Sequence, residues 1–186
     1  MEREFLLTKG FTQEQAEILS AAFSSYELIE DGAYFLHKGH ICKRIALITS
    51  GMCRYLYHTE KEEVTRWISL KGDFMTSLGS FINQKPSFEA IQAIRPTEIY
   101  FIHLENWELL KSKHPFILHF WNRTIEQNYI GMEERLFVTI AKTAEERYHW
   151  LLENYPRFNQ EVPDKYIASM LGITPRHLSR IRAQRH

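Results

Sequence analysis

Cysteine is scarce in this chain, and its scarcity excludes two classes of protein. Two cysteines, Cys42 and Cys53, cannot form the disulfide framework of a small secreted domain. Two thiolates also cannot supply the four cysteine ligands that an iron–sulfur cluster usually needs. We therefore expect both to be reduced thiols that pack as small hydrophobic residues in a sheet.

Long apolar runs are also missing. No stretch approaches the roughly 18 apolar residues that a membrane-spanning helix needs. The N-terminus opens with the charged segment Met1–Glu4 and lacks the apolar core of a signal peptide. These absences predict a cytoplasmic protein with no membrane partner. The composition, 44% hydrophobic and 25% charged, indicates a folded chain of one large domain or two small ones.

Motifs typical of enzymes and metal sites are absent from the sequence. It has no nucleophile elbow, no glycine-rich phosphate loop and no His-x-His segment of the kind found in cupin-like metal enzymes. His37, His40 and Cys42 are close together, but no carboxylate completes a known ligand spacing, so ordinary turn and strand residues are the better interpretation. We expect no enzyme activity, no metal and no cofactor. A cupin-like metal enzyme is the weaker alternative, because small β-rolls resemble the cupin barrel.

The charge of the chain is balanced overall, with 23 basic and 23 acidic residues. The balance hides an asymmetry, because residues 164–186 contain five basic residues and one acidic residue, a net charge of +4. The rest of the chain therefore carries −4. This segregation favours contact of the C-terminal end with a polyanion, with a solvated basic tail as the alternative.

The first part of the chain changes from a helical to a strand pattern. Residues 11–23 predict a helix with Thr12 and Gln15 as a capping box. Five short β-rich runs then alternate with glycine-bearing turns. The runs are 33–37, 44–48, 53–57, 64–68 and 99–103, and the turns lie at Gly32, Gly39, Gly51 and Gly72. The pattern predicts an antiparallel, jelly-roll-like β-roll that ends near Pro115.

A long helical pattern follows Pro115. Its apolar residues recur at spacings of three and four: Leu118, Trp121, Ile125, Tyr129, Met132 and Leu136. A helix of about 20 residues spans about 30 Å, which is longer than a small domain needs for itself. The stripe fits packing on the chain's own roll or pairing with the same helix of a second subunit, and periodicity does not distinguish them. A second helical segment, 143–154, is closed by Pro156.

The C-terminal segment predicts two short helices joined by a tight turn. The first covers 164–171, and Gly172 supplies the positive φ that ends it. Thr174 caps the second helix, and Pro175 occupies its first position, where a missing N–H costs nothing. With the small residue Ala168 at the crossing, this is the pattern of a helix-turn-helix.

The second helix keeps a polar face once the inward residues Leu178 and Ile181 are set aside. Its residue types hydrogen-bond guanine edges and phosphates in a major groove. The predicted DNA-contacting residues are Lys165, Thr174, Arg176, His177, Ser179, Arg180 and Arg182. We expect Arg180 to contact a base edge, and Arg182 and Lys165 to lie nearer the phosphates. An ordinary helical hairpin with a polar face is the alternative.

The order of these parts resembles the Crp/Fnr family of transcription regulators. The resemblance rests on Lys38-Gly39, Ile45–Ile48, Ser50-Gly51, Gly72-Asp73-Phe74, 167–175 and 178–181. It implies an α+β protein with a β-roll effector domain (1–115), a dimerisation helix (116–140) and a helix-turn-helix domain (141–186). It also implies a homodimer that binds double-stranded DNA at a two-fold symmetric operator, with the long helix as the seam. The resemblance also suggests RNA polymerase as a further partner.

The effector site of cyclic-AMP-binding members is not retained. Those members hold the ribose with a Gly-Glu pair and the cyclic phosphate with an Arg-Ser pair, and these positions are Thr76-Ser77 and Ser87-Phe88 here. A Thr-Ser pair that meets adenine falls at Met132-Glu133. Burying a phosphate without its cation is costly, so we expect no cyclic AMP binding. The candidate effector pocket, which holds an unidentified ligand or is filled by its own side chains, comprises Phe74, Thr76, Ser77, Phe81, Ser87 and Phe88.

The DNA-reading unit departs from the cyclic-AMP type as well. Those members open the reading helix with Arg-Glu, where Pro175-Arg176 stands here, while their later arginine matches Arg180. A different operator is expected. No β-hairpin wing follows the reading helix within these 186 residues. A ligand- or protein-binding sensor module without DNA binding is the remaining alternative, and the arginine face argues against it.

Overall fold

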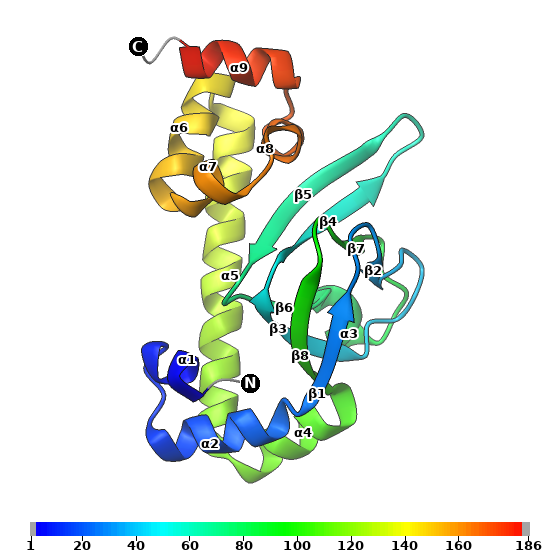
Figure 1. Cartoon of the computed structure of the whole chain (residues 1–186), viewed down its shortest axis with the longest axis vertical. Helices are drawn as coiled ribbons and strands as arrows, with labels where there is room; N and C mark the ends of the chain where they lie inside the picture. The colour runs from blue at the N-terminus through cyan, green and yellow to red at the C-terminus, as the bar shows by residue number, and fades with distance from the viewer. Residues whose placement is uncertain (1–2, 184–186) are drawn as a thin grey trace. The chain divides into compact units, whose positions relative to one another are not determined.

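The computed structural model describes residues 3–183 (Figure 1). These residues form two compact units. One comprises the residues up to Glu63 together with Trp67–Phe120, and the other comprises Val64–Arg66 together with the residues from Trp121 onwards. The combination of helices with antiparallel sheets confirms the predicted α+β class.

Two four-stranded antiparallel sheets form the roll. Their strand orders are β1-β8-β3-β6 and β2-β7-β4-β5. The strands are β1 (Ser25–Ile29), β2 (Tyr34–Leu36), β3 (Arg44–Ser50), β4 (Met52–His58), β5 (Glu63–Leu70), β6 (Phe74–Met75), β7 (Ala90–Ala93) and β8 (Thr97–His103). The five predicted runs correspond to β2, β3, β4, β5 and β8. Strands β1, β6 and β7 were not predicted from the sequence.

Strand β3 lies inside its sheet, between β8 and β6, and is covered on both faces. Its residues 45–48 are all buried. Beside β3 in the same sheet, Phe74 of β6 pairs with Leu47. The Phe74 ring lies 5.7 Å from the ring of Phe23 and 5.5 Å from that of Phe120. Aromatic residues from helical segments therefore close this side of the roll.

Four helices belong to the first unit: α1 (Arg3–Thr8), α2 (Gln13–Ala22), α3 (Leu78–Asn83) and α4 (Leu104–Lys113). The helix expected over 11–23 is α2, and the predicted capping box is present, because Thr12 and Gln15 bond each other's backbone N–H groups. The other three helices were not predicted. Trp107 of α4 is fully buried and packs its ring 6.4 Å from Phe23.

The turn at Gly51 carries the chain from β3 in one sheet to β4 in the other. Its φ of +82° lies in the left-handed region, which favours glycine. A Cβ atom at this position would stand 2.4 Å from the carbonyl oxygen of Pro96 and 2.5 Å from Oγ1 of Thr97. The Thr97 hydroxyl also accepts a hydrogen bond from Met52 N–H at 3.0 Å. Close approach of two backbones therefore requires glycine here.

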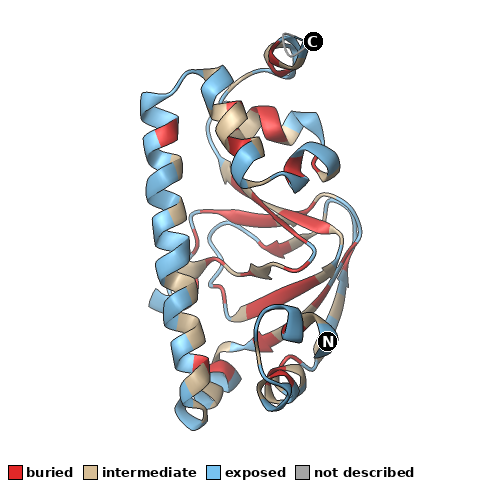
Figure 2. Ribbon diagram, turned by 90° about the vertical axis from the view of Figure 1, so that its left-hand side faces the viewer, coloured by how far each residue is buried: buried red, intermediate tan, exposed pale blue. Residues whose placement is uncertain are grey.

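The second unit is helical apart from residues 64–66 of β5. Its helices are most of α5 (Pro115–Ala141), then α6 (Ala144–Asn154), α7 (Arg157–Glu161), α8 (Asp164–Met170) and α9 (Pro175–Ala183). Thr143 and Glu146 form a capping box at the start of α6. Helix α5 is exposed along most of its length (Figure 2). In the described part of the chain, no helix combines the length and the apolar character needed to cross a membrane.

Candidate nucleic-acid interface

The turn between α8 and α9 has the hydrogen bonds of a Schellman motif. Gly172 adopts a φ of +66°, as expected from the sequence. Its N–H donates to the carbonyl of Ser169 (3.1 Å), and the N–H of Ile173 donates to the carbonyl of Ala168 (3.0 Å). Thr174 then begins α9, because its hydroxyl accepts the N–H of His177 (3.2 Å). The geometry of this turn is therefore encoded locally in the sequence, by Gly172 and by the capping residue Thr174.

The inner faces of α8 and α9 supply the core of the helix pair. Ile167 and Ala168 of α8 and Leu178 and Ile181 of α9 are all buried. Ala168 is small enough for the two helices to approach closely. The sequence pattern placed Ala168 at the crossing and Leu178 and Ile181 on the inner face, and the burial of these residues fixes which face of α9 points outwards.

The outer face of α9 presents two arginines. Arg176 and Arg180 are exposed, as are Ser179 and Thr174, while His177 is half-buried. Among residues 3–183, neither guanidinium has a hydrogen-bond or salt-bridge partner. Lys165 on α8 is exposed as well, with its Nζ 4.7 Å from the ring centroid of Tyr166. Two planar cations with all their donors available are suited to bidentate contacts with guanine edges or phosphates.

Arg182 has different surroundings, although it lies only two residues beyond Arg180. Its side chain is 29% exposed and its Nη1 donates to Asp164 Oδ1 at 2.7 Å. Its Nε donates to Tyr148 Oη (2.9 Å) and its Nη2 to Asn159 Oδ1 (3.2 Å). Arg182 thus ties α9 to α6, α7 and α8.

The sequence analysis did not predict that these three residues contact Arg182. The available signal was Asp164, which is the one acidic residue of the basic segment 164–186. No comparable signal pointed to Tyr148 or Asn159, because their partner lies more than 20 residues away in the chain.

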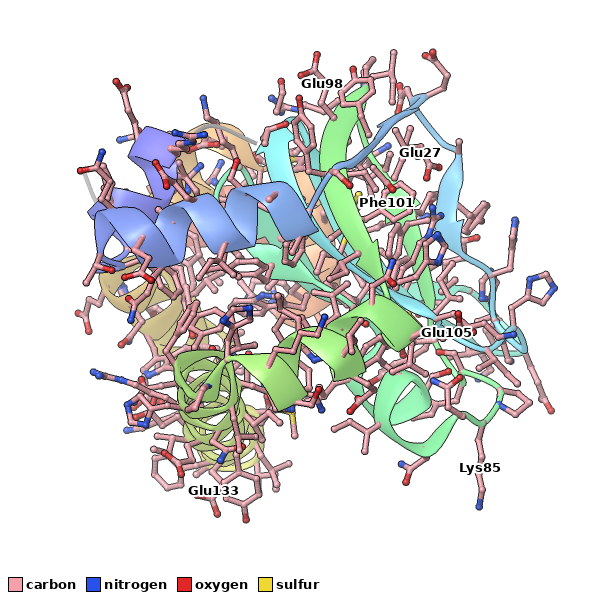
Figure 3. All side chains as sticks on the ribbon, turned by 90° about the horizontal axis from the view of Figure 1, so that it is seen from below. Glu27, Lys85, Glu98, Phe101, Glu105 and Glu133 are labelled. Atoms are coloured by element: carbon pink, nitrogen blue, oxygen red, sulfur yellow. The ribbon has the colours of Figure 1, made fainter. Side chains whose placement is uncertain are left out.

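Helix α5 carries an exposed apolar stripe. Tyr129, Met132 and Leu136 of the predicted seam are 58%, 51% and 60% exposed, and Leu118 is exposed as well. Trp121 and Ile125 are half-buried. Glu133 points away from the ribbon of α5 (Figure 3). An apolar stripe of this length on the surface of one chain is characteristic of a protein–protein contact.

The candidate effector residues of the roll have three different kinds of surroundings. The Phe74 ring takes part in the aromatic packing described above, and Phe81 is buried. Phe88 is 67% exposed and stacks on Tyr57, with 5.8 Å between ring centroids. Thr76 donates a hydrogen bond to the carbonyl of Arg44 (3.1 Å). The ring of Phe88 is therefore exposed to solvent and does not line an enclosed pocket, as was expected for a residue of the candidate effector site.

Ser77 and Ser87 do come together, as the sequence predicted for two positions of one site. Their hydroxyl oxygens lie 3.0 Å apart, and both residues are buried. Ser77 also donates to Oε1 of Glu89 at 2.9 Å, and Glu89 is only 4% exposed. Counting along the cassette placed no carboxylate here. The structure adds Glu89, which lies in the loop just before β7.

In the cluster formed by His37, His40 and Cys42, the two histidine rings pack against neighbouring rings. The His37 ring lies 4.4 Å from that of Tyr34 and 5.6 Å from that of His40. Across the described residues, no three His, Cys, Asp or Glu side chains are grouped so that they could hold a metal ion.

Both cysteines are buried and free. Cys53 lies in β4, and burial raises the pKa of its thiol to about 12. Cys42 lies two residues before β3 rather than in a strand. Its Sγ is 3.3 Å from Thr76 Oγ1.

The fold is similar to that of solved regulator structures, whereas no protein-family model and no curated protein matches the sequence. FixK2 from Bradyrhizobium japonicum has a TM-score of 0.75 at 16% identity, covering 86% of this chain and 83% of that chain. A CooA mutant from Carboxydothermus hydrogenoformans has a TM-score of 0.74 at 17% identity, covering 89% and 78%. A protein from Eubacterium rectale assigned to the Crp/Fnr family of transcriptional regulators has a TM-score of 0.67 at 16% identity, covering 97% and 86%. The predicted resemblance to Crp/Fnr regulators is thereby confirmed at the level of the fold.

Proposed function

We propose that this protein is a transcription regulator that binds double-stranded DNA as a homodimer, at an operator with two-fold symmetry. The observation that carries the proposal is the contrast among the arginines of α9. The Arg182 guanidinium donates hydrogen bonds to three residues of its own domain. Arg176 and Arg180 project from the same helix, are exposed, and have no hydrogen-bond or salt-bridge partner among the described residues. A guanidinium needs N–H donors that are not already bonded within the protein in order to read a base edge.

The fold of the whole chain supports the same proposal. Its solved neighbours include proteins described as transcriptional regulators. The exposed stripe on α5 offers a surface on which a second copy can pack, helix against helix. A symmetric pair of helix-turn-helix units binds two half-sites related by the same two-fold axis, which is why we propose a symmetric operator.

Capture of genomic DNA tests the proposal directly. The full chain is incubated with sheared genomic fragments at about 150 mM salt, where nonspecific phosphate contacts are weakened, and the retained fragments are sequenced. We expect enrichment of one inverted-repeat sequence. Arg176→Ala combined with Arg180→Ala should lose that enrichment while the protein stays folded. A protein that retains all sequences equally, or none, contradicts the proposal.

We also propose that the roll does not bind cyclic AMP. Ser77 stands where cyclic-AMP-binding members have the glutamate and Ser87 stands where they have the arginine. A buried carboxyl group, that of Glu89, accepts a hydrogen bond from Ser77. A cyclic phosphate placed there would meet the carboxyl group of Glu89. Losing the charged partner of a buried contact typically costs about 2–5 kcal/mol, and each 1.4 kcal/mol is a factor of about ten in affinity.

Isothermal titration with cyclic AMP and cyclic GMP checks this expectation. We expect no saturable heat at micromolar ligand. One-to-one binding of cyclic AMP with a dissociation constant below about 10 μM would show that the cassette is read in the wrong register.

A further inference from the structure

A pocket of about 420 Å³ lies between the C-terminal part of α5 and helix α6. The two helices run in opposite directions along it. Val138 and His149 line the part nearer their connection, and Glu134 and Glu153 line the far part. Small-molecule sites usually have volumes of about 300–1,000 Å³, so this pocket is large enough for a small organic ligand.

The apolar part of the pocket is formed by two aromatic rings and one aliphatic residue. Val138 is buried, Trp150 is half-buried, and Phe137 is 60% exposed. An open aromatic surface of this kind attracts apolar groups. It also attracts cations, because the face of an aromatic ring carries partial negative charge.

The charged part of the pocket is acidic. Glu146 pairs with Lys142 (3.2 Å) and accepts the N–H of Thr143 in the capping box (2.8 Å), so these two charges offset one another. Glu134 and Glu153 remain. Within the residues that the structure describes, neither carboxylate has a hydrogen-bond or salt-bridge partner. His149 turns to Glu145, at 3.7 Å.

We propose that this pocket binds an organic cation. Its apolar or aromatic body would pack against Phe137 and Trp150, and its ammonium or guanidinium group would be held by Glu134 and Glu153. An anion is disfavoured by the surplus of negative charge, and a neutral ligand leaves that charge unused. The inference goes beyond DNA binding and does not depend on it.

The pocket does not belong to the predicted dimer seam. Successive residues of an α-helix are separated by about 100° around the axis. Phe137 therefore lies about 100° around the axis from the seam residue Leu136, and Val138 and Glu134 each lie about 160° from it. The occupant is accordingly a small ligand rather than the α5 helix of a second copy.

Three probes that share an indole ring and differ in charge test the proposal. Tryptamine is a cation, tryptophol is neutral and indole-3-acetate is an anion. Isothermal titration into the full chain should give saturable binding of one tryptamine per chain, weaker binding of tryptophol and no binding of indole-3-acetate. Glu134→Gln and Glu153→Gln should each weaken tryptamine binding about two- to fivefold and leave tryptophol binding unchanged. This loss corresponds to about 0.4–1 kcal/mol, within the range that partly exposed ion pairs contribute.

Two controls locate the binding. Glu126→Gln removes an exposed carboxylate of α5 outside the pocket and should change nothing. Phe137→Ala, at an exposed position that tolerates truncation, should weaken both tryptamine and tryptophol. The indole N–H signal of Trp150, assigned in a ¹H–¹⁵N spectrum with Trp150→Phe, should shift first among the four tryptophans.

The proposal is overturned by equal binding of all three probes, by tryptamine binding that both glutamine variants leave intact, or by the absence of saturable binding. A first shift at another tryptophan also overturns it. None of these results bears on DNA binding, and failure to capture DNA leaves the titration result standing.

Discussion

Arg180 and Arg182 stand two residues apart on α9, and their surroundings predict opposite defects. Arg180→Ala removes a guanidinium that has no hydrogen-bond or salt-bridge partner among residues 3–183. We expect it to cost about 1–3 kcal/mol of binding free energy on the captured operator and to relax specificity at one base position per half-site. Competition binding with operator and random DNA measures both. An equal loss on the two DNAs contradicts base reading by Arg180.

Arg182→Ala should act on folding. It removes the contacts to Asp164, Tyr148 and Asn159, of which the one to Asp164 is partly screened by solvent. We expect the free energy of unfolding to fall by about 1–2 kcal/mol, as for the loss of partly exposed hydrogen bonds to a charged group. Urea denaturation measures the change, with Arg176→Ala as the control that leaves stability unaltered. If Arg182→Ala is as stable as the wild type but binds DNA more weakly, Arg182 contacts phosphates, as predicted from the sequence, and does not mainly stabilise the fold.

Gly51 and Gly39 form a matched pair for testing a close backbone approach. Both have positive φ, +82° and +84°. A Cβ at Gly51 would meet the Pro96 carbonyl oxygen at 2.4 Å, whereas nothing lies within 4 Å at Gly39. Gly39→Ala should therefore cost about 1–2 kcal/mol from backbone strain alone. Gly51→Ala should cost at least about 2 kcal/mol more, because the clash forces the backbone to shift. Equal urea midpoints for the two variants would contradict the close approach.

At the scale of elements, the start of α6 predicts a pH effect. The Glu146 carboxylate accepts the backbone N–H of Thr143, and the Thr143 hydroxyl accepts the backbone N–H of Glu146. Hydrogen bonding to Thr143, together with Lys142, lowers the pKa of Glu146 from 4.5 to about 2. A depressed folded-state pKa stabilises the protein above pH 4.5, and this contribution is lost as the pH falls from 4.5 to 2. The stability difference between the wild type and Glu146→Gln should therefore shrink across that range.

Urea denaturation at pH 5, 4, 3 and 2 measures this difference. Glu145→Gln is the matched control, because it removes a carboxylate from the same helical turn that does not bond to Thr143. A wild-type advantage over Glu146→Gln that stays constant down to pH 2 would mean that the capping bond does not depend on ionisation.

The elements that could be predicted from sequence are those whose own residues determine them. Helix α2, helix α6 and the α8–α9 turn each carry a cap and an apolar periodicity within a few residues. Strand β7 (Ala90–Ala93) contains two alanines, which favour helices, and it is a strand because β2 and β4 pair with it on either side. Two-residue β6 and five-residue α7 are too short to show any period. The place of Glu89 in the candidate effector site was not predicted for a related reason, because only the fold brings its side chain to Ser77.

For the whole molecule, α5 predicts the assembly state. Its 27 residues span about 40 Å, with an apolar stripe exposed over much of that length. Met132→Glu combined with Leu136→Glu should convert a dimer into monomers, because two carboxylates would have to be buried in the seam. Sedimentation velocity at micromolar concentration measures the mass. The control, Arg123→Glu with Gln127→Glu, changes exposed residues on the opposite flank of α5 and should remain dimeric. A wild-type monomer at that concentration contradicts the seam.

On α9, different residues hold the helix in place and face the solvent, and this separation affects how such a protein can evolve. The residues that hold the helix in place, Leu178, Ile181 and Arg182, are distinct from the exposed positions 176, 179 and 180. Substitutions at exposed positions usually change stability by less than about 0.5 kcal/mol. If α9 reads DNA as proposed, a lineage can therefore exchange these three residues, and with them the DNA sequence that is recognised, without passing through an unfolded ancestor. Duplicated copies of the gene would diverge first at these positions.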